Sequence, residues 1–85
     1  MIIKIFGDNC STCRATVRAV QDAAAAMDSN IQVIVTEDIL EILRQHILQT
    51  PAVVIDGHTA SMGRHLTRDE AHKLIEKYLL NDDYK

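Results

Sequence analysis

The chain has 85 residues, which suits one domain and is too short for two. Nine lysine and arginine residues against twelve aspartate and glutamate residues give a formal net charge of -3, and no basic block or aromatic-interleaved basic patch appears, so we expect no nucleic-acid partner. No run approaches the roughly 18 apolar residues of a membrane span, so we expect no membrane partner either.

The first half of the chain predicts a strand, a long helix and a second strand. Residues 1–6 are apolar apart from Lys4 and end at a Gly-Asp-Asn turn, which is typical of a buried strand. From about Cys10, apolar side chains recur every three or four residues, as in an amphipathic helix, at Val17, Val20, Ala24 and Met27. The polar residues 28–30 end this helix, and the run IQVIV at 31–35 predicts the second strand.

The second half predicts a helix, a β-hairpin and a final helix. Asp38 and Glu41 are typical of a helix N-cap and its first turn. The apolar stripe of this helix is expected to consist of Ile39, Ile42, Leu43 and Ile47. The run AVVI at 52–55 predicts a third strand, and the Asp56–Gly57 pair predicts a tight turn into a short fourth strand at 58–62.

A capping box at Thr67–Glu70 predicts the start of the last helix. Its apolar stripe is expected to consist of Ala71, Leu74, Ile75, Tyr78 and Leu79. Residues 80–85 are expected to form a frayed tail. The element order is β-α-β-α-β-β-α. Because a right-handed crossover makes the first two strands parallel and the hairpin adds an antiparallel pair, we predict an α/β fold, a single domain over residues 1–85 with a mixed four-stranded sheet flanked by helices.

Both cysteines, Cys10 and Cys13, lie where the first strand gives way to the first helix. Residues three apart on a helix share a face, so the two sulfur atoms can meet at its first turn. There Cys10 faces the unpaired backbone N–H groups and the positive end of the helix dipole, which stabilise a thiolate and lower the pKa of its thiol. Cys13 lies further along the helix, is expected to be less exposed, and is suited to resolve a mixed disulfide formed at Cys10.

A disulfide between these cysteines closes a very short loop, which the chain-entropy model rates at about 2 kcal/mol of stabilisation. That is little for a structural crosslink in a reducing compartment, and it suits a redox switch. Two other interpretations of the pair stay open at this point. The two thiolates can bind a metal, or both side chains can simply pack as small apolar groups.

The only proline, Pro51, stands directly before the third strand, and two interpretations of it stay open. Proline is tolerated at the first residue of a strand, so it can be a simple strand entry. Alternatively, the Thr50–Pro51 peptide bond is cis and brings backbone close to the cysteine pair as a platform for substrate.

Lys4 interrupts the otherwise apolar first strand. In one interpretation, the aliphatic part of its side chain is partly buried and the ammonium group at its end reaches water. A sharper hypothesis places it beneath the cysteines, where its charge favours a thiolate, although Asp8 acts in the opposite direction.

Together these motifs resemble the thioredoxin-like small redox-active disulfide proteins, also called mini-thioredoxins or glutaredoxin-like proteins. The resemblance runs from Met1 to about Leu80. Its anchors are the Cys-Ser-Thr-Cys motif at 10–13 and the TPAVVIDG segment that begins at Thr50. It implies a thioredoxin fold and thiol–disulfide chemistry.

The resemblance also implies a role for each anchor residue. Cys10 is implied to be the attacking thiolate and Cys13 the resolving thiol, while a cis Thr50–Pro51 bond faces them and binds substrate. The residues between the cysteines depart from the family, because thioredoxin proper has Gly-Pro there and glutaredoxins typically have Pro-Tyr. In this chain Ser11 and Thr12 are expected to play a supporting role, through first-turn hydrogen bonds or as helix caps. The glycine pair of glutaredoxins is not matched by SMGRHLT, which argues against a glutathione site.

The main alternative is a CxxC metal-binding module like the small copper chaperones, in which two thiolates take Cu(I) at the start of a helix. Those domains run β-α-β-β-α-β, usually carry a methionine where Asp8 stands, and have no role for TPAVVIDG. A second alternative is a non-catalytic protein that keeps the thioredoxin fold and binds a partner through Met62 or the turn at 63–65.

We therefore predict a thiol–disulfide oxidoreductase that transports electrons through Cys10 and Cys13 and needs no cofactor and no metal. Its substrate is expected to be a disulfide-containing protein or a small thiol compound, and an unidentified reductase recycles it. The N-terminal apolar run is too short for a secretory signal, so we expect a cytoplasmic protein. We expect it to be a monomer.

Overall fold

The computed structural model describes residues 1–7, 11–27 and 30–80. Its elements follow the predicted order, and their boundaries lie within a residue or two of those expected except at the end of α2: β1 (Ile2–Phe6), α1 (Ser11–Met27), β2 (Gln32–Thr36), α2 (Ile39–Arg44), β3 (Ala52–Ile55), β4 (His58–Met62) and α3 (Arg68–Leu80). None of the helices in these ranges has the length and apolar character needed to cross a membrane.

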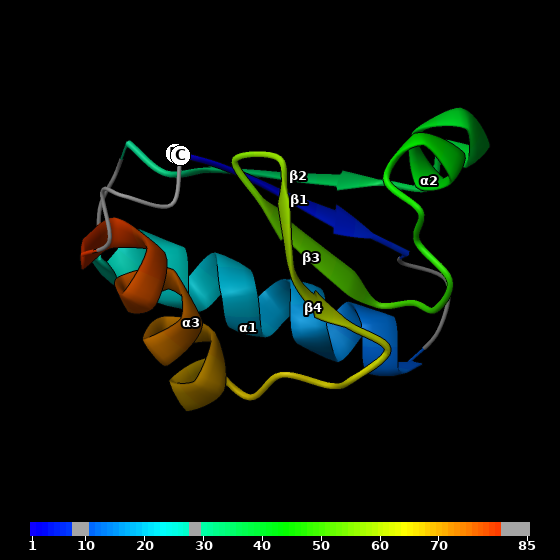
Figure 1. Cartoon of the computed structure of the whole chain (residues 1–85). Helices are drawn as coiled ribbons and strands as arrows, with labels where there is room; N and C mark the ends of the chain where they lie inside the picture. The colour runs from blue at the N-terminus through cyan, green and yellow to red at the C-terminus, as the bar shows by residue number, and fades with distance from the viewer. Residues whose placement is uncertain (8–10, 28–29, 81–85) are drawn as a thin grey trace.

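The four described strands form one mixed sheet in the order β2-β1-β3-β4. β1 and β2 are parallel and β3 and β4 are antiparallel, which confirms both predicted pairings. β1 also pairs antiparallel with β3, so that Ile3 lies opposite Ile55 and Ile5 opposite Val53. Figure 1 shows α1 and α3 together on one side of this sheet and α2 on the other. The predicted α/β architecture is confirmed.

The face of the sheet covered by α1 and α3 holds the larger core cluster. Side chains alternate along a strand, so Ile3 and Ile5 of β1 both point to this face, where they meet Val53 and Ile55 of β3. The two helices add mostly small residues to the same cluster: Ala19, Val20, Ala23, Ala24, Ala71 and Ile75. Small side chains let α1 pack closely against α3, and this contact holds the helix that carries Cys13 against the sheet.

α2 covers the opposite face only in part. The buried residues here are Phe6, Ile47, Ala52 and Val54, with the half-buried Ile42 packed against them. Two members of the predicted stripe of α2, Ile42 and Ile47, therefore do pack inward. The prediction was wrong for the other two, because Ile39 is 70% exposed and Leu43 is 65% exposed.

The reason lies in the early end of α2, which stops at Arg44. His46 adopts a left-handed conformation, with φ of 57°. Its amide donates to the Leu43 carbonyl at 3.2 Å, and the Ile47 amide donates to the Ile42 carbonyl at 3.0 Å, which is the Schellman arrangement of a helix end. Six residues make fewer than two turns, too few to align the expected stripe, and Ile47 reaches the core from beyond the helix.

The capping box at the start of α3 is confirmed. The Thr67 amide donates to Glu70 Oε1 at 3.0 Å, and the Glu70 amide donates to Thr67 Oγ1 at 3.2 Å. Arg64 Nη2 donates to the other carboxylate oxygen of Glu70 at 2.7 Å. Interactions with Thr67 and Arg64 lower the pKa of the Glu70 carboxyl below its ordinary 4.5. The largest is the hydrogen bond from the Thr67 backbone, followed by the hydrogen bond with the Thr67 side chain and by the positive charge of the Arg64 guanidinium.

This pKa shift predicts an acid-sensitive contribution to stability that Glu70→Gln removes. Because the folded pKa lies below the unfolded one, the unfolded chain takes up a proton first as the pH falls below about 4.5, and stability declines until the folded carboxyl is protonated too. We expect the free energy of unfolding, measured by urea titration, to fall more in the wild type than in E70Q between about pH 5 and about pH 3. Parallel pH profiles for the two proteins would contradict this.

Candidate active site

Four segments meet at the end of the sheet where β1 stops: Gly7 after β1, the first turn of α1, the loop before β3 and the turn after β4. The Gly7 amide donates to the carbonyl of Thr36, the last residue of β2, at 3.0 Å. The Gly63 amide donates to the Pro51 carbonyl at 2.9 Å. These backbone hydrogen bonds fix the loops around the start of α1.

Gly7 is the point of closest approach between the segments. Its φ is +101°, a conformation that residues with a side chain rarely adopt. A β-carbon at this position would lie 2.9 Å from Thr50 Cβ and 3.3 Å from Cys13 Sγ. Thr50 and Cys13 therefore approach the same point in space from two different segments, and the absence of a side chain at Gly7 makes room for both.

The expectation that Cys13 is shielded is confirmed, since it lies in the first turn of α1 and is 2% exposed. Cys10 lies outside the described residues, so its position and its part in the site stay predictions. Ser11 and Thr12 occupy the first turn of α1 and are exposed. Their supporting role also stays a prediction.

The Thr50–Pro51 peptide bond is cis, as one of the two interpretations of Pro51 proposed. Pro51 is buried and leads directly into β3, whereas Thr50 is exposed. Of the predicted site residues, the structure thus brings Cys13 and Thr50 together at Gly7. The role of Thr50 and Pro51 in substrate binding stays a prediction.

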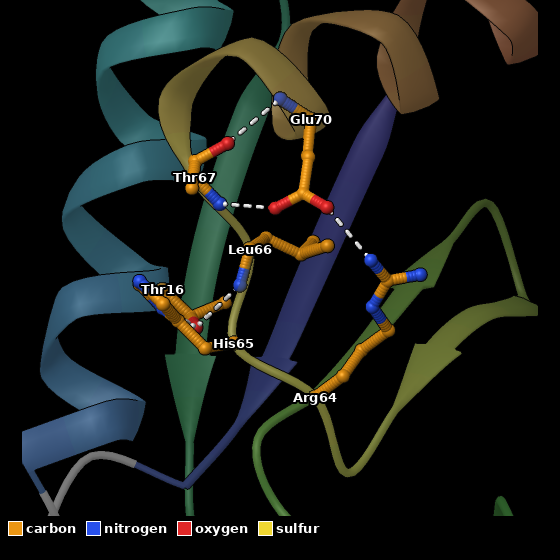
Figure 2. A network of polar contacts seen from close by, with 6 residues as sticks. All are labelled: Thr16, Arg64, His65, Leu66, Thr67 and Glu70. Atoms are coloured by element: carbon orange, nitrogen blue, oxygen red, sulfur yellow. Dashed lines mark hydrogen bonds and ion pairs between the residues drawn. The ribbon is translucent and has the colours of Figure 1, made fainter.

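A hydroxyl group ties α1 to the segment that follows β4. Thr16 is fully buried one turn after Cys13. Its Oγ1 accepts a hydrogen bond from the Leu66 amide at 3.2 Å and lies 3.3 Å from His65 Nδ1. Figure 2 shows these contacts beside the capping box of Glu70. Thr16 therefore fixes the segment between β4 and α3 against the helix that carries Cys13.

Lys4 does not support the hypothesis of a cation beneath the cysteines. It follows Ile3 and precedes Ile5, which both face α1, so strand alternation turns it to the face covered by α2. There its ammonium group forms an ion pair with the Glu41 carboxylate. Its charge is therefore offset by a partner on α2, and the side chain keeps 37% of its surface exposed.

The fold argues against the copper-chaperone alternative. A helix, α2, stands between β2 and β3, so the order is not the β-α-β-β-α-β of those domains. Within the described parts of the chain, no three His, Cys, Asp or Glu side chains gather closely enough to hold a metal ion.

Sequence reasoning missed two residues that shape the site. Gly7 was assigned only to a turn, and no local pattern reveals that Thr50 and Cys13 converge on it. Thr16 had a usable signal, because it shares the three- and four-residue spacing of Cys13, Val20 and Ala23 and is thus a polar residue on the buried face of a helix.

Comparison with known proteins supports the resemblance that the sequence motifs suggest. A family model described as a thioredoxin domain matches residues 1–76. The structure of thioredoxin 1 from the thermophilic eubacterium Thermosipho africanus TCF52B is similar, with a TM-score of 0.69 and 27% sequence identity over 94% of this chain and 96% of that chain. A search of curated proteins finds no match.

The contact at Gly7 predicts that Gly7→Ala lowers the free energy of unfolding. Gly57 provides a matched control, because its φ is +87° and nothing lies within 4 Å of an added β-carbon. We expect G57A to cost about 1–2 kcal/mol from backbone conformation, and G7A to cost about 1–3 kcal/mol more from crowding. Urea titration measures both, and alkylation under denaturing conditions verifies that the thiols are intact. Equal losses in the two variants would contradict the contact.

The buried hydroxyl of Thr16 predicts that Thr16→Val lowers the free energy of unfolding. Valine keeps the shape of the side chain and removes the hydrogen-bond acceptor. The Leu66 amide then loses its partner in a buried position, which costs about 1–3 kcal/mol. Thr59→Val, on the exposed surface of β4, is the control and should change the free energy of unfolding little. A T16V variant as stable as T59V would show that the Leu66 amide finds another acceptor.

Proposed function

Because the chain belongs to the thioredoxin domain family, whose general role is thiol–disulfide chemistry, we propose that it is a thiol–disulfide oxidoreductase with Cys10 and Cys13 as its redox couple. The observation that carries this proposal is the approach of Cys13 Sγ and Thr50 to one point at Gly7. A sulfur atom thus lies in the first turn of a helix, beside an exposed loop residue. A substrate disulfide needs both a sulfur to react with and a surface to lie on.

The proposed reaction proceeds in two exchanges that conserve electrons. The Cys10 thiolate attacks one sulfur of the substrate disulfide, forming a mixed disulfide and releasing the other substrate sulfur as a thiolate. Cys13 then loses its proton to solvent and attacks Cys10 Sγ, which forms the Cys10–Cys13 disulfide and releases the second substrate thiolate. Two electrons pass from the protein to the substrate, and a dithiol reductant restores the starting state.

The burial of Cys13 supports the assignment of the first attack to Cys10 and of the second to Cys13. A sulfur that is 2% exposed is poorly accessible to a bulky disulfide from solution, so the first attack falls to Cys10. An intramolecular attack by Cys13 needs no such access. In this scheme Thr50 and Pro51 hold the substrate backbone beside the sulfur atoms, and Ser11 and Thr12 stabilise the first turn of α1.

The redox couple is part of the polypeptide, so the proposed reaction uses no cofactor. The substrate is a protein or small-molecule disulfide, and the electron donor is a separate reductase or a small dithiol. We propose that the protein is a monomer and that it lies in the cytoplasm, where the reducing environment favours the dithiol form.

Cys10→Ser is expected to reduce catalysed disulfide reduction to the uncatalysed rate, because serine cannot form the mixed disulfide. The measurement is insulin reduction with dithiothreitol as electron donor, with circular dichroism to verify the fold. A Cu(I) and Zn(II) titration of the wild type runs beside it. Activity that persists in C10S would contradict the assignment of the attacking sulfur.

Cys13→Ser is expected to trap the substrate on Cys10, because the second exchange is missing. Mass spectrometry of the intact protein, incubated with a peptide disulfide, should show one covalent adduct that dithiothreitol removes. The double variant C10S/C13S is the control and should show no adduct. A C13S variant that turns over at the wild-type rate would overturn the two-step scheme.

A further inference from the structure

A groove of about 380 Å³ lies between β4 and α3. Its apolar lining comes from Ala60 of β4, Leu66 of the connecting segment and Leu74 of α3. Leu66 is buried, while Ala60 and Leu74 are half-buried and so leave apolar surface open to the groove. α3 packs against α1 rather than against β4, and this leaves space between the last strand and the last helix.

The polar residues that line this groove are mostly cationic, although the protein as a whole has a formal net charge of -3. Arg64, Lys73 and Lys77 line it together with a single carboxylate, that of Glu70. Arg64 is already paired with Glu70, and Figure 2 shows its side chain reaching from the segment after β4 towards α3. In the part of the chain that the structure describes, Lys73 and Lys77 have no carboxylate partner within 4 Å and are exposed.

The groove begins beside the candidate active site. Met62 lines the groove. Its sulfur accepts a hydrogen bond, at 3.4 Å, from the amide of Leu48, which lies in the loop that leads to Pro51. The next residue, Gly63, donates its amide to the Pro51 carbonyl. A chain that lies along Thr50 and Pro51 can therefore continue over Met62 into the groove without leaving the surface.

One further feature suits an extended polypeptide. β4 is the last strand of the described sheet and pairs only with β3, and an extended peptide can add to such an edge through main-chain hydrogen bonds.

We propose that this groove is an extended substrate subsite, which selects protein disulfides whose cysteine is followed or preceded by an acidic segment. The inference rests on the proposed function and narrows its substrate class from any disulfide to an acidic polypeptide. The apolar floor contacts the aliphatic parts of the segment, and Lys73 and Lys77 attract its carboxylates.

The test compares two peptides that each contain one internal disulfide. In one peptide, aspartates flank the disulfide on both sides, and in its twin every aspartate is replaced by asparagine. With dithiothreitol as electron donor at low ionic strength, we expect kcat/KM for the aspartate peptide to exceed that for its twin by about tenfold. The preference should shrink in concentrated salt, because exposed charges are screened.

The variant K73E/K77E is expected to lose or reverse the preference. R18E/R44E is the matched control, because it makes the same change of net charge at exposed positions on α1 and α2, outside the groove. It should keep the preference. An NMR titration with the aspartate peptide gives a second readout, and we expect shifts of the Ala60 and Leu74 amide signals that K73E/K77E abolishes.

Four outcomes would overturn the inference. If both peptides are reduced at equal rates, the proposed function stands and the subsite does not. If both charge-reversed variants lose the preference equally, net charge and not the groove is responsible. If the wild type shows no preference and D82N/D83N gains one, the groove holds the chain's own acidic tail. If neither peptide is reduced at all, the proposed function fails and the subsite falls with it.

Discussion

A side chain at position 7 would fill the space in which Thr50 and Cys13 approach each other. The structure depends on its absence, because a β-carbon there would come within 2.9 Å of Thr50 and 3.3 Å of the Cys13 sulfur. Thr50, which is distant in the sequence, and Cys13, which follows closely, therefore converge on one glycine. This convergence turns a cysteine near the start of a helix into part of a site, since it supplies the neighbouring surface on which a substrate can lie.

The convergence is held in place by two kinds of contact. Alanines on α1 and α3 pack together over the sheet, which keeps α1 at a fixed depth and buries Cys13. The hydroxyl of Thr16 accepts a hydrogen bond from the Leu66 amide, which anchors the segment between β4 and α3 to the same helix. Both ends of the proposed substrate path, the loop at Pro51 and the groove beside α3, are thus positioned relative to one helix.

Sequence patterns were reliable where an element has a strong local signal. The run AVVI is buried on both faces of the sheet, and all four residues form β3 as expected. The capping box at Thr67 and Glu70 is present with both reciprocal hydrogen bonds. α2 is the counterexample, because its apolar spacing predicted a buried stripe, whereas the helix ends after Arg44 and leaves Ile39 and Leu43 in solvent. Spacing does not reveal how long a helix continues.

The sequence by itself determined the order of the elements and drew attention to the cysteine motif and the Thr50–Pro51 pair, because propensity, turn chemistry and helix caps act between neighbours in the chain. Only the tertiary structure decided that Thr50 meets Cys13 at Gly7, that Lys4 pairs with Glu41, and that a cationic groove opens between β4 and α3. These are contacts between residues distant in sequence, and they are set by how helices and sheet pack, which no local pattern records.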